Sequence, residues 1–307
     1  MSGRFSVRST RTVALALCLL SIVIFADSAS AARRKVARTK VARTKVARTK
    51  VARAKVLPPE VAPSESTRCN PELVVLHGYS ARKDLPAICR VFDETKAKFA
   101  EVFGTTRADN DFTKGLNLYV GFGRQEYRSI AEGYLSKDDG EGFSVYYENE
   151  ATDHNNFGQI GYFRDPKEEI ENTNLAHEFV HYFDSQYNLA GTGDQGVPLL
   201  WWSEGLAQTL GRSMFDGALV DQKRYKFSLS QIMNNQEAGQ SDRLQALVYG
   251  GGELAVRYFL ERQPELLDQM LALTKHDDYE GYGQWLGKIG TSYNADFKSF
   301  VAESAAG

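Results

Sequence analysis

The segment with the clearest chemical potential is a His-Glu-x-x-His motif that contains His177, Glu178 and His181. On a helix, residues four apart share a face, so both imidazoles can bind one metal ion. Glu178 would lie beside that ion, where its carboxylate can take a proton from a metal-bound water. The motif predicts a zinc site that activates water; the alternative is an ordinary helix with two exposed histidines.

A third ligand is expected shortly after the motif. Glu204 lies in the sequence WWSEGLA, 23 residues beyond His181. Two histidines and a glutamate leave the fourth position of a tetrahedral zinc ion to water, as in hydrolytic zinc sites. Gly205 and Ala207 are small, and we expect them where this second helix packs tightly against the first. At least one of the two preceding tryptophans is expected in the core.

The flanking sequence predicts the elements that would position these residues. Helical periodicity is expected over 84–103, 125–135, 168–187, 203–214, 229–234, 243–262, 264–275, 279–288 and 294–304. Strands are expected at 116–122, 143–148 and 159–163. A small mixed sheet followed by helices predicts an α+β fold, with a sheet-plus-zinc-helix subdomain at 69–214 and a helical subdomain at 215–307.

Charge is distributed unevenly over the 307 residues, although the formal net charge is only −2. Residues 33–55 carry eleven Lys/Arg and no acid, whereas the chain from residue 56 onward has 23 basic and 38 acidic side chains. With 42% hydrophobic residues the chain is too apolar to be disordered throughout. The acidic body argues against a basic nucleic-acid-binding domain, and we expect no specific nucleic-acid site.

Residues 1–31 have the features of a secretory signal peptide. Arg4, Arg8 and Arg11 precede an apolar run over 13–25, and small residues follow up to Ala31. The run is too short for a comfortable membrane span, and the residue before Cys18 is not the small one that lipidation requires. We therefore expect cleavage near residue 31 and a secreted protein, either extracellular or periplasmic.

Residues 32–68 are expected to form a basic arm and a proline-containing linker. A five-residue Lys-Val-Ala-Arg-Thr repeat begins at Lys35, and its period does not match the helix, so charge would surround any helix that formed. The arm is either a solvated spacer or an attachment to an anionic surface such as wall polymer, lipid headgroups or DNA. Next, Cys69 and Cys89 suggest one disulfide in an exported chain, with two reduced thiols as the alternative.

Two segments resemble the zinc core of the bacterial collagenases, which belong to the gluzincin group of zinc peptidases. These are HEFVHYFDSQYN and PLLWWSEGLA, and weaker similarity extends over about 85–304. The resemblance implies a gluzincin-like core and a zinc endopeptidase with His177, His181 and Glu204 as ligands. It also implies that Glu178 is the general base and acid, and that Tyr249 stabilises the oxyanion.

The same resemblance implies a substrate-binding strand and a second ion. The strand Phe143–Glu148 would pair with an extended substrate through Ser144, Val145 and Tyr146. Glu148 would be a carboxylate ligand of a calcium ion, to which the loop 185–191 would contribute backbone carbonyls.

Two departures from the family pattern affect the expected activity. Gln208 occupies a position, four after Glu204, that is usually acidic; an amide oxygen can still orient a ligating histidine but carries no charge. The large activator domain and the collagen-binding modules are not recognisable in this sequence. We therefore expect cleavage of gelatin, peptides or loose chains. We also expect the protein to be a monomer. The alternatives are a narrow-specificity protease or aminopeptidase, and a surface-attached colonisation factor with the zinc fold as a scaffold.

Overall fold

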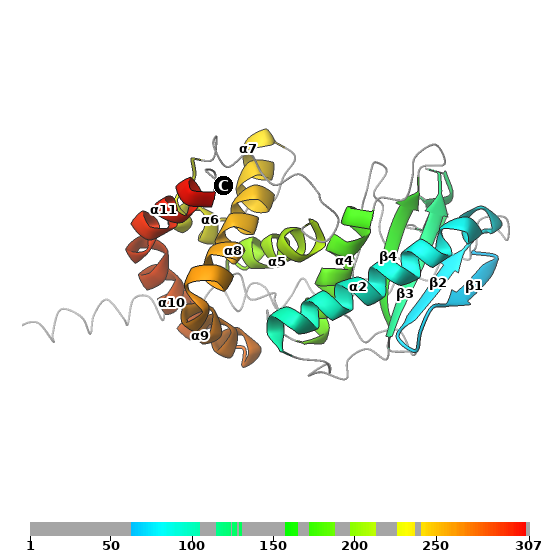
Figure 1. Cartoon of the computed structure of the whole chain (residues 1–307), viewed down its shortest axis with the longest axis horizontal. Helices are drawn as coiled ribbons and strands as arrows, with labels where there is room; N and C mark the ends of the chain where they lie inside the picture. The colour runs from blue at the N-terminus through cyan, green and yellow to red at the C-terminus, as the bar shows by residue number, and fades with distance from the viewer. Residues whose placement is uncertain are drawn as a thin grey trace, which may run out of the picture. The chain divides into compact units, whose positions relative to one another are not determined.

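The computed structural model describes residues 63–104, 115–123, 125–127, 129–130, 157–164, 172–187, 197–212, 226–236 and 241–304. These segments belong to one compact unit, Val56–Gly307, in which a four-stranded sheet is combined with helices (Figure 1). The α+β prediction is confirmed at this level. The predicted signal peptide, the basic arm and the boundary between subdomains near residue 215 lie outside the described residues.

The described sheet is mixed, with the strand order β1-β2-β3-β4. The strands are β1 Glu65–Arg68, β2 Leu73–His77, β3 Gly115–Phe122 and β4 Phe157–Arg164. β1 pairs antiparallel with β2, and the pairs β2–β3 and β3–β4 are parallel. The helix α2, Leu85–Phe103, connects β2 to β3, because parallel neighbours need a long crossover. β3 is apolar on both faces: Leu118 joins the main core, whereas Tyr119 packs with Tyr127 and Ile130.

The folded region begins earlier than the sequence predicts, because β1 lies inside the segment 32–68 that was expected to be arm and linker. The strand has the sequence ESTR, which contains no hydrophobic alternation. Its extended conformation instead depends on backbone pairing with β2, in which Glu65 faces His77 and Arg68 faces Val74. A hydrogen bond of 2.9 Å between Thr67 Oγ1 and His77 Nε2 adds to this pairing.

The predicted helices are present wherever the structure describes their residues. They are α4 Asn172–Gln186, α5 Leu200–Ala207, α6 Leu229–Met233, α7 Asp242–Gln245, α8 Gly252–Arg262, α9 Pro264–Lys275, α10 Tyr279–Ser292 and α11 Asn294–Ser304, with the 3-10 turn η1 at Tyr79–Asp84. Among the described residues, π-helical turns occur at Gln208–Arg212 (η2, after α5) and at Ala246–Gly251 (η4, before α8). Within the described part of the chain, no helix has both the length and the apolar character needed to cross a membrane.

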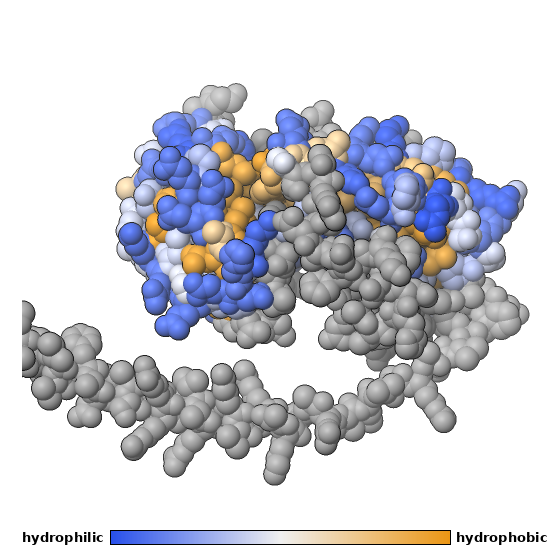
Figure 2. Space-filling view, turned by 90° about the horizontal axis from the view of Figure 1, so that it is seen from below, coloured by the Kyte–Doolittle hydropathy of each residue, from blue (hydrophilic) through white to orange (hydrophobic). Residues whose placement is uncertain are grey.

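One aromatic-rich core connects the sheet side to the helices. Phe92 of α2 packs edge-on against Phe179 of α4, with 5.0 Å between ring centroids. Trp201 of α5 packs against Phe259 of α8, with 5.6 Å between centroids. Hydrophilic residues cover most of the described surface in the view of Figure 2. α4 and α5 are therefore held by the core on both sides, which is the condition for a rigid site between them.

Candidate metal centre

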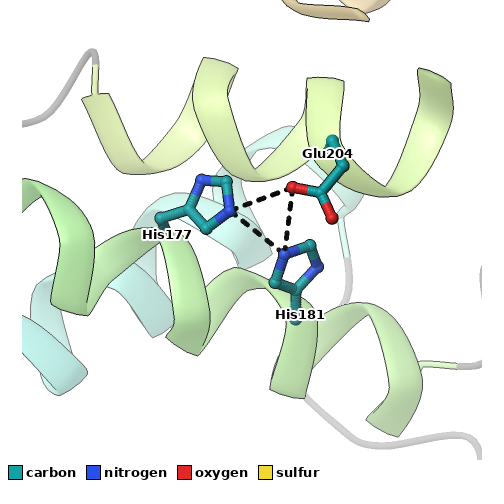
Figure 3. Close-up of side chains that lie close together, drawn as sticks. All are labelled: His177, His181 and Glu204. Carbon is teal, nitrogen blue, oxygen red and sulfur yellow. Dashed lines mark hydrogen bonds and ion pairs between the residues drawn. The ribbon is translucent and has the colours of Figure 1, made fainter. Parts of the chain in front are cut away.

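Three side chains from two helices converge between α4 and α5 (Figure 3). His177 Nε2 lies 3.2 Å from His181 Nε2 and 3.2 Å from Glu204 Oε2, and His181 Nε2 lies 3.7 Å from the same oxygen. A tetrahedral zinc ion with bonds of about 2.0–2.1 Å would hold its ligand atoms about 3.3 Å apart. The spacing and the chemistry of these donors therefore suit one zinc ion.

Burial and charge make this group a site for a cation. Burial by itself would lower the pKa of His181, but the Glu204 carboxylate, followed by Glu178 and Asp184, raises it to about 9. Burial by itself would raise the pKa of Glu204, but the two imidazoles hold it well below its usual range. Glu204 is thus a partly buried anion whose charge is balanced by protonated histidine, and a divalent cation can replace that proton.

Ser203 contacts one of the two imidazoles, which the sequence did not predict. Its Oγ lies 3.3 Å from His181 Nδ1. A proton on Nδ1 can be donated to this hydroxyl, which leaves the lone pair on Nε2 facing the metal position. The position of Ser203 immediately before Glu204 was the available signal, although serine is too common in helices to be singled out.

A glycine contact brings the end of the second helix onto the first, and it is not the one predicted. A Cβ on Gly211, in η2, would come within 2.7 Å of the backbone nitrogen of His177. A Cβ on Gly205 would instead meet Gly252 of α8 at 2.3 Å. The expectation that Gly205 packs against the histidine helix is therefore wrong. The side of α5 that carries Gly205 faces α8, because Glu204 already occupies the side facing α4.

Tyr249 reaches the metal group from η4, much later in the chain. Its ring centroid lies 6.2 Å from that of His177. Burial, together with the negative charges of Glu204 and Glu178, raises the pKa of Tyr249 to about 12. The tertiary structure therefore brings five of the predicted site residues together, and the phenol keeps its proton at neutral pH.

A buried carboxylate and the two tryptophans complete the surroundings of the group. Trp202 Nε1 donates a hydrogen bond of 3.4 Å to Asp184 Oδ1, and Asp184 lies one turn beyond His181 on α4. Trp201 Nε1 donates to the hydroxyl of Tyr282 at 3.1 Å. Both tryptophans are buried, in agreement with the prediction that at least one belongs to the core.

Other predicted site residues lie outside the described part of the chain. These are Ser144, Val145, Tyr146 and Glu148, together with residues 188–191 of the proposed calcium loop. Cys69 and Cys89 are joined by a disulfide, which ties the turn after β1 to α2. The Oε1 atom of Gln208 is buried and has no hydrogen-bond partner among the described residues.

Comparison with known proteins identifies the family to which this chain belongs. A model of a peptidase family described as collagenase (Peptidase_M9) matches residues 28–300. Because this match covers most of the sequence, the chain belongs to the collagenase family of metallopeptidases. The resemblance seen in the zinc-motif segments is thereby confirmed.

The match to individual relatives covers only a part of each relative's length. The chain is 26% identical to a microbial collagenase of Vibrio vulnificus (strain CMCP6) over 236 residues, which cover 70% of this chain and 29% of that protein. It is 29% identical to microbial collagenases of Vibrio parahaemolyticus serotype O3:K6, over 138 residues, and of Vibrio alginolyticus, over 133 residues. These two matches cover 44% and 41% of this chain and 16% of each relative. The chain thus spans less than a third of the length of these curated relatives.

Proposed function

We propose that this chain is a zinc-dependent endopeptidase whose catalytic centre lies between α4 and α5. The observation that carries the proposal is the triangle of ligand atoms from His177, His181 and Glu204, whose sides are close to those a tetrahedral zinc ion requires. Glu178 and Tyr249 lie close enough to this triangle to interact with its charges. Membership of the collagenase family supports peptide-bond hydrolysis as the reaction.

The residues divide the chemistry between them. Zinc, when bound, would polarise the scissile carbonyl and lower the pKa of a water molecule. Glu178 takes the proton of that water and later delivers it to the leaving amine. The protonated phenol of Tyr249 donates a hydrogen bond to the carbonyl oxygen as negative charge develops on it.

The substrate and location are part of the same proposal. The relatives named as microbial collagenases make collagen-derived chains the first substrates to test, and gelatin or peptides are the proposed ones. Substrate pairing at Ser144–Tyr146 and a calcium ion at Glu148 follow from the family resemblance. Secretion of a monomer is proposed from the signal-peptide features of residues 1–31.

The decisive experiment compares the full purified chain with its Glu178→Gln variant. We expect about one zinc per chain in both proteins, because Glu178 is not a ligand. Gelatin hydrolysis should be sensitive to chelator and should fall by on the order of a thousandfold in the variant, since the general base is lost. Glu265→Gln, an exposed substitution on α9, is the matched control and should keep full activity.

The possible outcomes separate the alternatives. Substantial hydrolysis by pure Glu178→Gln protein would contradict the assigned base. Zinc binding without hydrolysis of gelatin or a peptide library by the wild type would contradict a general endopeptidase and favour a narrow substrate. Absence of zinc would favour the surface-attached binding factor.

A further inference from the structure

The helix that carries Glu204, α5, contacts α8, the helix that follows Tyr249, directly through the backbone. A Cβ on Gly205 would lie 2.3 Å from both the carbonyl carbon and the oxygen of Gly252. A Cβ on Gly252 would lie 2.8 Å from the Trp201 oxygen and 3.0 Å from Gly205 Cα. No side chain fits on either side of this contact, since such distances are well inside van der Waals separation.

Each glycine is closely connected to a residue of the proposed catalytic centre. Gly205 follows Glu204 directly in α5. Gly252 follows the π-turn η4, and its backbone N–H donates to the carbonyl oxygens of Tyr249 and Val248. A displacement of α8 away from α5 would therefore carry Tyr249 away from Glu204.

A buried threonine fastens the same contact. Thr209 Oγ1 donates to the Gly205 carbonyl at 2.7 Å and lies 3.4 Å from the Glu253 carbonyl, so the hydroxyl bridges α8 and the end of α5. The labels α5 and α8 lie side by side in Figure 1, in agreement with these distances. Close backbone approach and a shared hydroxyl leave the two helices little freedom to slide.

We propose that the Gly205–Gly252 contact, fastened by Thr209, is the positioning element that sets Tyr249 relative to the metal centre. The inference rests on the proposed function, in which Tyr249 stabilises the oxyanion. Gly205, Gly252 and Thr209 act through Tyr249 and do not touch substrate. The contact fixes the position of the Tyr249 phenol relative to Glu204 in the metal site. The hydrogen-bond donor for the transition state is then in place before the reaction begins.

The test is a double-mutant comparison in the full chain. We expect Tyr249→Phe to lower kcat about a hundredfold, which is typical of losing one oxyanion donor. Gly252→Ala should lower kcat about tenfold or more and leave KM and zinc content within about twofold, because ground-state binding is intact. In the Tyr249→Phe background, Gly252→Ala should change kcat less than about twofold. Gly283→Ala is the control, because a Cβ on Gly283 meets nothing within 4 Å.

Thr209 supplies a variant that adds no atom at the backbone contact. Thr209→Val removes the bridging hydroxyl and should lower kcat severalfold in the presence of Tyr249 only. Thr209→Ser keeps a hydroxyl and should restore most of the rate. If Gly252→Ala does not fold, Thr209→Val and Thr209→Ser take its place, each compared with and without the Tyr249 hydroxyl.

A crystal structure of Thr209→Val gives a readout that does not depend on activity. We expect the Tyr249 ring to leave its place 6.2 Å from the His177 ring. An unmoved ring, or an equal loss of kcat with and without the Tyr249 hydroxyl, would overturn the proposal. If Tyr249→Phe keeps the wild-type kcat while the Tyr249 ring moves in Thr209→Val, the oxyanion role of Tyr249 is contradicted. The positioning of Tyr249 by the Gly205–Gly252 contact is then still supported.

Discussion

At the scale of single residues, the proposed metal centre is a small set of charges that stabilise each other. Glu204 is partly buried and keeps its negative charge because His177 and His181 face it at 3.2 and 3.7 Å. The negative charges of Glu204, Glu178 and Asp184 in turn raise the pKa of His181, so its imidazole stays protonated to a higher pH than an ordinary histidine. This mutual dependence gives the metal-free protein a stability that varies with pH.

The first prediction concerns the metal-free chain. Its carboxylate neighbours raise the pKa of His181 to about 9 in the folded state, against 6.5 for an ordinary histidine, so its contribution to stability is complete below about pH 6.5 and is lost as the pH rises through 9. The melting temperature in the presence of chelator should therefore fall between pH 6.5 and 9. In Glu204→Gln the fall should be much smaller, because the main cause of the raised pKa is gone. An unchanged pH profile in that variant would contradict the prediction.

At the scale of elements, glycines decide how closely the helices that carry the site approach one another. Gly211 allows η2 to touch α4 at His177, and the pair Gly205 and Gly252 allows α5 to touch α8. The first contact bears on metal binding and the second on the phenol, so the two should be separable by substitution.

The second prediction tests the contact at α4. Gly211→Ala places a methyl group 2.7 Å from the His177 nitrogen, so the backbone must shift, at a cost of about 1–3 kcal/mol in the free energy of unfolding. Zinc affinity should fall as well, since His177 moves with the backbone. Gly287→Ala, on α10 with open space around it, should instead be neutral or stabilise by up to about 1 kcal/mol. Urea unfolding and zinc titration measure both effects; equal behaviour of the two variants would refute the argument.

The third prediction concerns the disulfide between Cys69 and Cys89, which are 20 residues apart. Replacing both cysteines by alanine should lower the free energy of unfolding by about 3 kcal/mol, because the unfolded chain regains the freedom of that loop. The kcat of the folded fraction should be unchanged, since the bond joins the start of the sheet to α2. Denaturant unfolding and active-site titration give the two quantities, and a large change in kcat would show that the bond also shapes the site.

At the scale of the whole molecule, the chain divides by charge. The eleven basic residues of 33–55 contrast with the acidic composition from residue 56 onward. The proposed catalytic residues all lie in the acidic part, within Val56–Gly307. Catalysis and attachment to an anionic surface should therefore be separable.

The fourth prediction follows from this division. Deleting residues 33–55 should leave kcat/KM for gelatin within about twofold, because no proposed site residue is removed. Binding to vesicles rich in anionic lipid should be lost, and in the intact chain it should weaken as salt is raised. Vesicle sedimentation at two salt concentrations checks this. A loss of hydrolysis on deletion would contradict an arm that serves attachment alone.

Features that depend on short-range spacing were predictable from the order of the amino acids alone. The interval between His177 and His181 matches one helical turn, and Glu204 follows at a distance that a second helix can bridge. The helices were predictable for the same reason, since amphipathic periodicity is a local property of the chain. The order of a small sheet and a helical half followed from the succession of these patterns.

Which elements contact one another became clear only from the folded protein. β1 forms because it pairs with β2 through the backbone. The four polar residues of β1 contain no pattern that predicts a strand. The partner of Gly205 proved to be Gly252, and Gly211 proved to be the residue against the histidine helix. Ser203 and Asp184 gained their importance from neighbours on another helix. The physical reason is common to all of them: contact between distant segments depends on how the core packs, which local periodicity does not encode.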